Sequence, residues 1–277
     1  MRRRDPLSIA LRLVAYLAAL ITMGAFLALV GYILAKGIPN LRPSLFAWDY
    51  TSENSSMTPA IVNTVLMTLM ALFFAAPLGI FTAIYLTEYA RRGSRLVRVV
   101  RTAAETLSGI PSIVYGLFGF LFFLTKLGWG FSLLSGACTL AIMILPLIMR
   151  TAEEAIRSVP DTYREGSFGL GAGRLRTVFR IVLPAAMPGI LSGIILATGR
   201  VVGETAALIY SAGTVAQIPS SVFSSARTLS VHMYVLSNEG LHMGEAFATA
   251  AVLLILVAIL NASSSKVANQ LAGGGSK

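Results

Sequence analysis

The sequence predicts an all-α, polytopic membrane protein with six transmembrane helices. Hydrophobic residues make up 56% of the 277 residues, and charged residues make up only 12%. Uncharged apolar runs long enough to cross a bilayer recur along the chain. Most basic residues gather in short segments between those runs, which is typical of loops that stay on the inner side of a membrane. We therefore expect helices that satisfy their own backbone hydrogen bonds within lipid.

The first two spans are predicted on either side of a polar loop. An uncharged run at residues 13–35 follows a basic N-terminal segment. The run is longer than the apolar region of a signal peptide, so we interpret it as the first span. Residues 36–59 form the polar loop, and the second span lies within residues 60–85.

A basic cluster separates the second span from the third. Its arginines recur at helical spacing and predict an interfacial helix over residues 91–102. They are Arg91, Arg92, Arg95, Arg98 and Arg101. The third span is predicted at residues 108–123 and the fourth at residues 131–149.

The last two spans enclose a long outer segment. The fifth span is predicted at residues 184–210 and is the only one with charges inside it. Residues 211–244 follow, with a short helix expected at 226–236. The sixth span is predicted at residues 246–260.

The basic residues also predict the orientation. Six spans place both ends of the chain on one side of the membrane. Most of the 22 lysines and arginines fall in segments assigned to the inside, whereas the outside receives Lys36, Arg42, Lys126 and Arg227. By the positive-inside rule both termini are cytoplasmic. The predicted parts are a cytoplasmic N-terminus at 1–12, a transmembrane domain at 13–262 and a disordered cytoplasmic tail at 263–277.

Several classes of function are excluded by what the sequence lacks. The net charge of +10 lies in loops between apolar runs, so it does not indicate a nucleic-acid-binding protein. No G-x-x-x-x-G-K-[ST] phosphate loop occurs, so any ATP must be bound by another subunit. No Ser/His/Asp constellation or metal-spaced His/Cys cluster occurs either, and His232 and His242 are interpreted as solvated loop residues. We expect a transport subunit that binds no cofactor or metal of its own.

The polar segment 161–184 carries the most specific pattern in the chain. Helical patterning on both sides of its glycines predicts a helix–turn–helix at the membrane surface, with a positive φ available in the turn. Small residues would let a partner approach closely, and a proline would end the second short helix. The positions of the pattern are Glu165, Gly166, Ser167, Gly171, Ile181, Leu183 and Pro184.

This spacing resembles the EAA loop of ABC importer permeases, E-A-A-x3-G-x9-I-x-L-P, which docks into a cleft of the ATPase subunit. Gly166 and Ser167 stand where the motif has two alanines, and both replacements are small. The resemblance implies a MetI-like, type I permease fold with a coupling loop at 151–183. It also implies that a partner subunit uses ATP. The alternative interpretation is an ordinary amphipathic surface loop.

Two charged residues stand out within the predicted fifth span. Arg200 and Glu204 lie at positions i and i+4, so on one continuous helix their side chains would share a face. Charged side chains inside a membrane normally face a partner or a wet cavity. Arginine offers forked donors that suit phosphate-like oxyanions. The pair therefore predicts a substrate pathway, and the alternative is an ion pair that only orients the span.

Further segments resemble the phosphate-specific, PstA-type permeases of this family over residues 50–245. They are SENSSMTPAIVNTVLMT, LSGIPSIVYGLFGF, GRVVGETAALIYSAG and TLSVHMYVLSNEG. The resemblance implies phosphate import across the bacterial plasma membrane. The implied partners are a PstC-type second permease, two copies of a PstB-type ABC ATPase and an extracytoplasmic PstS-type phosphate-binding protein. The alternatives are a permease for another oxyanion, such as molybdate or sulfate, and a secondary transporter driven by an ion gradient.

Overall fold

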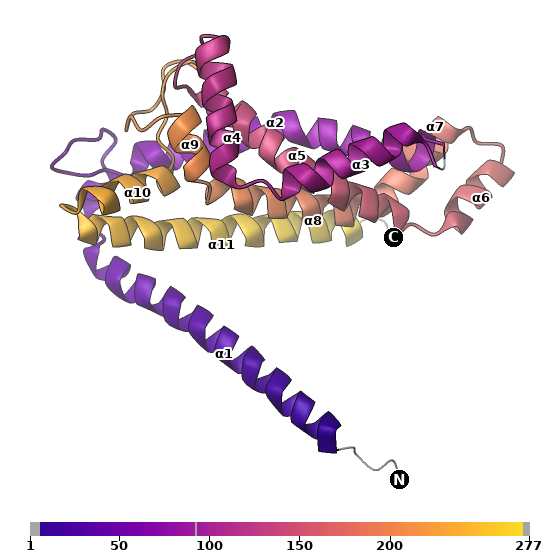
Figure 1. Cartoon of the computed structure of the whole chain (residues 1–277), viewed down its shortest axis with the longest axis horizontal. Coiled ribbons are helices and arrows are strands. Elements are labelled where there is room, and N and C mark those ends of the chain that lie inside the picture. Colours follow the sequence, from indigo (N-terminus) through magenta and orange to yellow (C-terminus); the bar gives the residue numbers. More distant parts are fainter. Residues whose placement is uncertain (1–5, 92, 274–277) are drawn as a thin grey trace.

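A computed structural model describes residues 6–91 and 93–273, and long helices dominate these residues. Four helices run side by side, as Figure 1 shows: α2 (Thr58–Ile84), α5 (Leu133–Arg157), α8 (Leu183–Val202) and α11 (Met243–Gly273). Within the described residues, five helices are long and apolar enough to cross a membrane. A bent pair, α3 with α4, makes a sixth if it is counted as one span. The predicted all-α membrane fold is confirmed.

Helix α5 forms the centre of the bundle. Its side chains Leu140, Ile144 and Ile148 are fully buried and pack in one cluster with residues of α2, α4 and α8. Small residues bring these helices close together. A Cβ atom added to Gly79 of α2 would lie 2.9 Å from Ile148, closer than real side chains approach. In lipid, where apolar burial drives helices together only weakly, such close backbone approach supports packing.

Helix α1 (Pro6–Gly37) projects away from the bundle (Figure 1). It contains the first span predicted at residues 13–35, yet no residue of its most apolar stretch is buried. Its contact with the bundle lies near its end, where the ring of Tyr32 meets Phe247 of α11 edge-on with centroids 5.8 Å apart. The apolar surface of α1 is therefore left for lipid or for another chain.

The predicted interfacial helix and third span differ from the structure. Residues 91–123 contain α3 (Arg95–Ser108) and α4 (Ser112–Gly119), and α4 continues as a wider π turn to Lys126. The two helices are bent by 103° at a break. Pro111 explains the break, because it has no N–H to donate and disfavours a helical Ile110. Helix α3 does not lie only at the membrane surface, because its Val97 is buried against the bundle.

The predicted fifth span at residues 184–210 is wrong at both ends. A continuous helix runs from α7 (Arg174–Thr177) through a π turn at Val178–Val182 into α8 and ends at Val202. A separate short helix, α9 (Ala206–Ser211), follows. The prediction that Pro184 ends a short helix is also wrong. A wider π turn lies directly before this proline, and such turns accommodate a missing N–H within a helix.

Helix α10 (Leu229–Glu239) and the loop between α1 and α2 lie at the end of the bundle opposite α6 (Figure 1). Helix α10 matches the helix predicted at residues 226–236, and α11 contains the sixth span. The loop between α1 and α2 holds two short 3-10 helices, Ile38–Asn40 and Pro43–Phe46.

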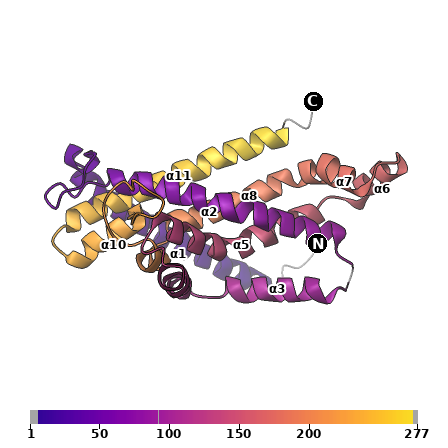
Figure 2. The same ribbon diagram turned by 90° about the horizontal axis from the view of Figure 1, so that it is seen from above.

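The tail predicted to be disordered is helical as far as Gly273, because α11 continues through it. The end of α11 diverges from the neighbouring helices, as Figure 2 shows. Residues 1–5 and 274–277, which belong to the predicted terminal segments, lie outside the described residues.

His232 is wrongly predicted as a solvated loop residue, because it is fully buried in α10. Its Nε2 lies 3.3 Å from the carbonyl oxygen of Ser55, and its Nδ1 lies 3.4 Å from the guanidinium of Arg227. The ring of Tyr50 packs edge-on against it at 5.9 Å. Burial, followed by the neighbouring Arg227 charge, lowers the pKa of His232 to about 4. The neutral imidazole thus joins α10 to the loop that precedes α2.

The lowered pKa of His232 predicts that the protein loses stability in acid. The folded pKa of about 4 lies below the ordinary value of 6.5, so the unfolded chain binds more protons between these pH values. The free energy of unfolding should therefore fall by about 3 kcal/mol as the pH drops through this window. Thermal unfolding in detergent from pH 7 to pH 4 measures the effect. The fall in the free energy of unfolding with decreasing pH should become shallower in His232→Gln. It should persist in the control His242→Gln, because His242 is only half-buried in the native chain. Equal slopes in the two variants would contradict the assignment.

Candidate functional site

The predicted helix–turn–helix is present at one end of the bundle (Figure 1). Helix α6 (Asp161–Gly169) leads into a tight turn, and α7 follows it. Gly171 sits in the turn with a φ of 80°, in the left-handed region that favours glycine. Its N–H donates to the carbonyl of Phe168, and the N–H of Ala172 donates to the carbonyl of Ser167. The positive φ expected among these glycines is confirmed at Gly171.

The motif residues divide into an exposed and a packed group. Glu165, Gly166 and Gly171 are exposed, as is Pro184 at the start of α8, whereas Ile181 and Leu183 are half-buried.

Ser167 belongs to the packed group and differs from the sequence-based expectation. It is buried, and its hydroxyl lies 2.8 Å from that of Thr177. A small residue at position 167 therefore lets α6 approach α7 within this chain. At Gly166, by contrast, an added Cβ atom would meet nothing within 4 Å, so packing within this chain does not require a glycine there.

Residues 151–157 of the predicted coupling loop belong to α5, so the name coupling loop is kept here for α6, α7 and the turn between them. Large apolar side chains are exposed on this segment and on the π turn that follows it. Leu170 is 91% exposed, and other exposed apolar residues are Tyr163, Phe168, Leu175 and Phe179. A groove of ≈ 280 Å³ runs between α6 and the start of the long helix, with walls from Leu170, Arg176 and Ile181. An exposed apolar patch rimmed by charge is typical of a protein interaction surface.

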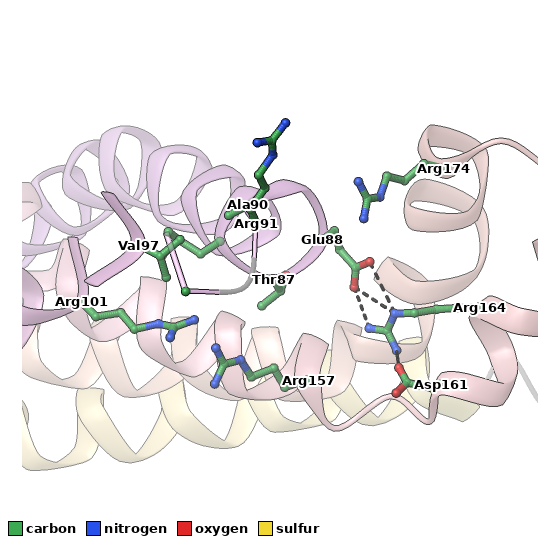
Figure 3. A pocket seen from close by; sticks show the side chains of 12 residues that line it. Thr87, Glu88, Ala90, Arg91, Val97, Arg101, Arg157, Asp161, Arg164 and Arg174 are labelled. Carbon is green, nitrogen blue, oxygen red and sulfur yellow. Dashed lines mark hydrogen bonds and ion pairs between the residues drawn. The ribbon is translucent and has the colours of Figure 1, made fainter. Parts of the chain in front are cut away.

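A buried ion pair fixes the coupling loop to the bundle. Nη2 of Arg164 in α6 lies 2.6 Å from Oε1 of Glu88, in the π turn Tyr85–Tyr89 that ends α2 (Figure 3). The Arg164 side chain is 16% exposed and that of Glu88 is 9% exposed. Arg164 also donates to the carbonyls of Val159 and Ile156 and contacts Asp161 at 3.2 Å.

Sequence reasoning missed this pair. The two residues are 76 positions apart, and nothing in either segment marks the other as its partner. The signals available were a glutamate at the end of a span and an arginine directly before the motif residue Glu165.

A second buried carboxylate holds α3 against α5. Oε1 of Glu153 lies 2.7 Å from Nη2 of Arg101 in α3 and 2.8 Å from Nη2 of Arg157, one turn further along α5. The Glu153 side chain is only 8% exposed. Part of the basic cluster expected to face lipid headgroups is therefore used inside the protein.

The structure separates the two predicted pathway residues. Arg200 lies on α8, where it is exposed, whereas its neighbours Val201 and Val202 are buried. Glu204 lies in the break after α8, and its Oε1 accepts a hydrogen bond from the N–H of Ala207 at the start of α9. Among the residues that the structure describes, no ion pair joins Arg200 to Glu204. The expected shared helix face is wrong, because the helix ends between them.

The family of the chain follows from comparison with known proteins. Residues 75–270 match the family described as "Binding-protein-dependent transport system inner membrane component". The chain belongs to this family. It is a multi-pass membrane permease, and the coupling loop and the break after α8 lie within the matched region.

Two relatives match most of this permease. "Probable ABC transporter permease protein YqgI" of Bacillus subtilis is 34% identical over 268 residues, which cover 88% of this chain and 89% of that protein. "Phosphate transport system permease protein PstA 1" of Mycobacterium tuberculosis strain H37Rv is 37% identical over 211 residues, which cover 75% and 68% respectively.

Solved structures share the fold of this permease. A bacterial alginate ABC transporter matches with a TM-score of 0.66 and 17% identity, covering 98% of this chain and 99% of that chain. The MetNI methionine ABC transporter in an inward-facing conformation matches with a TM-score of 0.61 and 18% identity, covering 78% and 94%. The expected MetI-like, type I fold is confirmed.

Proposed function

We propose that this permease carries inorganic phosphate across the bacterial plasma membrane as a subunit of an ATP-driven importer. The observation that carries the proposal is the 37% identity over 211 residues to a phosphate transport system permease. The chemistry of Arg200 fits such a substrate, because a guanidinium can offer two parallel donors to an oxyanion and keeps its charge. A permease for molybdate or sulfate and an ion-driven transporter have no comparable support.

In this proposal the coupling loop docks onto a PstB-type ATPase dimer, which binds the ATP. The exposed positions Glu165, Gly166 and Gly171 and the apolar patch around Leu170 would form the docking surface. Ile181, Leu183 and Pro184 continue from the loop into α8, and Ser167 keeps α6 against α7. Movement of the ATPase would be transmitted to α8 through the continuous helix that begins at α7, and to α2 through the Glu88–Arg164 pair. This movement would switch the permease between inward-open and outward-open states.

Further partners are inferred from surfaces that this chain leaves open. The unburied apolar stretch of α1 supports packing against a PstC-type second permease. A PstS-type phosphate-binding protein would dock at the opposite end from the coupling loop, near α10. The start of α1 and the end of α11 both point toward the coupling-loop end (Figure 1), which supports cytoplasmic termini.

The importer class is tested by labelled phosphate uptake in cells that contain the whole transport system. ATP depletion with the proton gradient intact should stop uptake, whereas collapse of the gradient at normal ATP should not. Excess sulfate or molybdate should leave uptake unchanged. Uptake that follows the gradient would support the ion-driven alternative, and competition by another oxyanion would reassign the substrate.

Gly171→Val is expected to uncouple ATP hydrolysis from phosphate uptake while the chain still inserts. Valine at a φ of 80° costs about 1–2 kcal/mol, so the turn should change shape. Gly173→Val is a matched control, because Gly173 has an extended φ of −74° that valine adopts freely. Uptake and co-purification with the ATPase measure the effect. Wild-type uptake by a Gly171→Val permease that still binds its ATPase would contradict the docking role of this turn.

A further inference from the structure

A basic cavity lies beside the coupling loop, away from Arg200. It has a volume of ≈ 620 Å³ and is enclosed by the π turn after α2, by α3, by the end of α5 and by α6 and α7 (Figure 3). Five arginines from separate elements line it, together with two carboxylates. The arginines are Arg91, Arg101, Arg157, Arg164 and Arg174, and the carboxylates are Glu88 and Asp161.

The carboxylates near the cavity do not balance its arginines. Glu88 and Asp161 both pair with Arg164, and Glu153, behind the wall, pairs with Arg101 and Arg157. Among the described residues, neither Arg91 nor Arg174 makes an ion pair. Even with all three carboxylates ionised, two arginine charges remain without an acidic partner.

The two arginines that make no ion pair within the described residues come from different elements. Arg91 follows the π turn at the end of α2, and Arg174 begins α7. The guanidinium of Arg174 lies over the ring of Tyr89, 5.5 Å from its centroid. Figure 3 shows Arg174 at the edge of the cavity. Arginine recognises phosphate groups through charge-assisted, paired hydrogen bonds.

We propose that this cavity binds a phosphate-group oxyanion at the coupling-loop end of the permease. A phosphate monoester carries a charge of about −1.5 to −2 at neutral pH, and inorganic phosphate is a mixture of monoanion and dianion, so either is comparable to the two unbalanced arginine charges. The volume accepts either a free phosphate or the headgroup of a phosphorylated lipid. The site goes beyond the proposed function, because its lining does not include Arg200, the residue proposed to meet the transported phosphate.

A bound oxyanion would connect elements that the coupling loop has to move. Arg91 follows α2, whereas Arg174 belongs to the long helix that continues into α8. An anion between them would join these helices at a second point beside the Glu88–Arg164 pair. We therefore expect occupancy to restrain the loop and to slow ATP-driven transport.

Protection of a cysteine in the cavity wall tests the site directly. Ala90 lines the cavity, and the only native cysteine is Cys138. The probe is an Ala90→Cys, Cys138→Ala chain in phosphatidylcholine nanodiscs, and the readout is its rate of maleimide labelling. Inorganic phosphate at about four times its Kd should slow labelling about fivefold relative to chloride at equal ionic strength. A second disc composition, containing phosphatidic acid, should slow labelling without added phosphate if the source is a lipid headgroup.

Two pairs of arginine variants decide whether the protection comes from the cavity. Arg91→Gln with Arg174→Gln should abolish it. Arg95→Gln with Arg98→Gln removes the same charge from exposed positions of α3 outside the cavity and should leave it intact. Absence of protection in both disc compositions, or protection that survives in the cavity variant, would overturn the proposal. Neither result bears on phosphate import, because labelling does not depend on the transported substrate.

Discussion

Arg164→Gln should disconnect the coupling loop from α2 and nearly abolish ATP-driven phosphate uptake. The substitution leaves Glu88 buried without its cation, and such a loss typically costs 3–5 kcal/mol. It also removes the donors to the carbonyls of Val159 and Ile156, which hold the start of α6. Uptake by cells that contain the complete importer measures transport, and thermal unfolding of the purified chain measures stability.

A double-mutant cycle separates the pair from its surroundings. Glu88→Gln should also lower stability, since Arg164 then loses its carboxylate. The double variant Glu88→Gln with Arg164→Gln should recover part of the stability, because no buried charge remains unpaired. Uptake should stay low in the double variant, because the connection between α6 and α2 is still weakened. Arg95→Gln removes an exposed arginine and should behave as wild type. Normal uptake by Arg164→Gln would show that the pair does not transmit movement.

The coupling loop could be predicted from sequence because its shape is decided locally. Gly171 tolerates a positive φ whatever surrounds it, and the patterning of α6 lies within a few residues of the turn. The Glu88–Arg164 pair could not be predicted in this way. It depends on how the end of α2 meets α6, and that meeting is a property of the packed bundle.

The bounds of the fifth span could not be predicted from the sequence. Hydropathy favours a single helix through residues 184–210, since composition alone does not register where a helix ends. The structure ends α8 at Val202, and Glu204 accepts a hydrogen bond from the first turn of α9. The burial of His232 could not be predicted either, because its partners Ser55 and Arg227 come from two separate loops. Local sequence therefore indicates which residues are charged, and tertiary packing decides which of them are free to act.

The separation of Arg200 from Glu204 makes different results expected for the two residues. Glu204 receives the N–H of Ala207, and glutamine can accept the same hydrogen bond. Glu204→Gln should therefore slow uptake only modestly. Arg200 is exposed on α8 with no carboxylate partner among the described residues, so its charge is free for a substrate.

Arg200→Gln should lower phosphate uptake about 10- to 100-fold, as expected when hydrogen bonds to a charged group are lost. Arg200→Lys should restore part of the rate, because lysine keeps the charge but loses the two-pronged geometry. The double variant Arg200→Gln with Glu204→Gln should be as inactive as Arg200→Gln alone, since the two side chains do not compensate each other. Uptake is measured at equal membrane levels and equal ATPase association. Near-normal uptake by the double variant would mean that Arg200 does not meet the translocating phosphate.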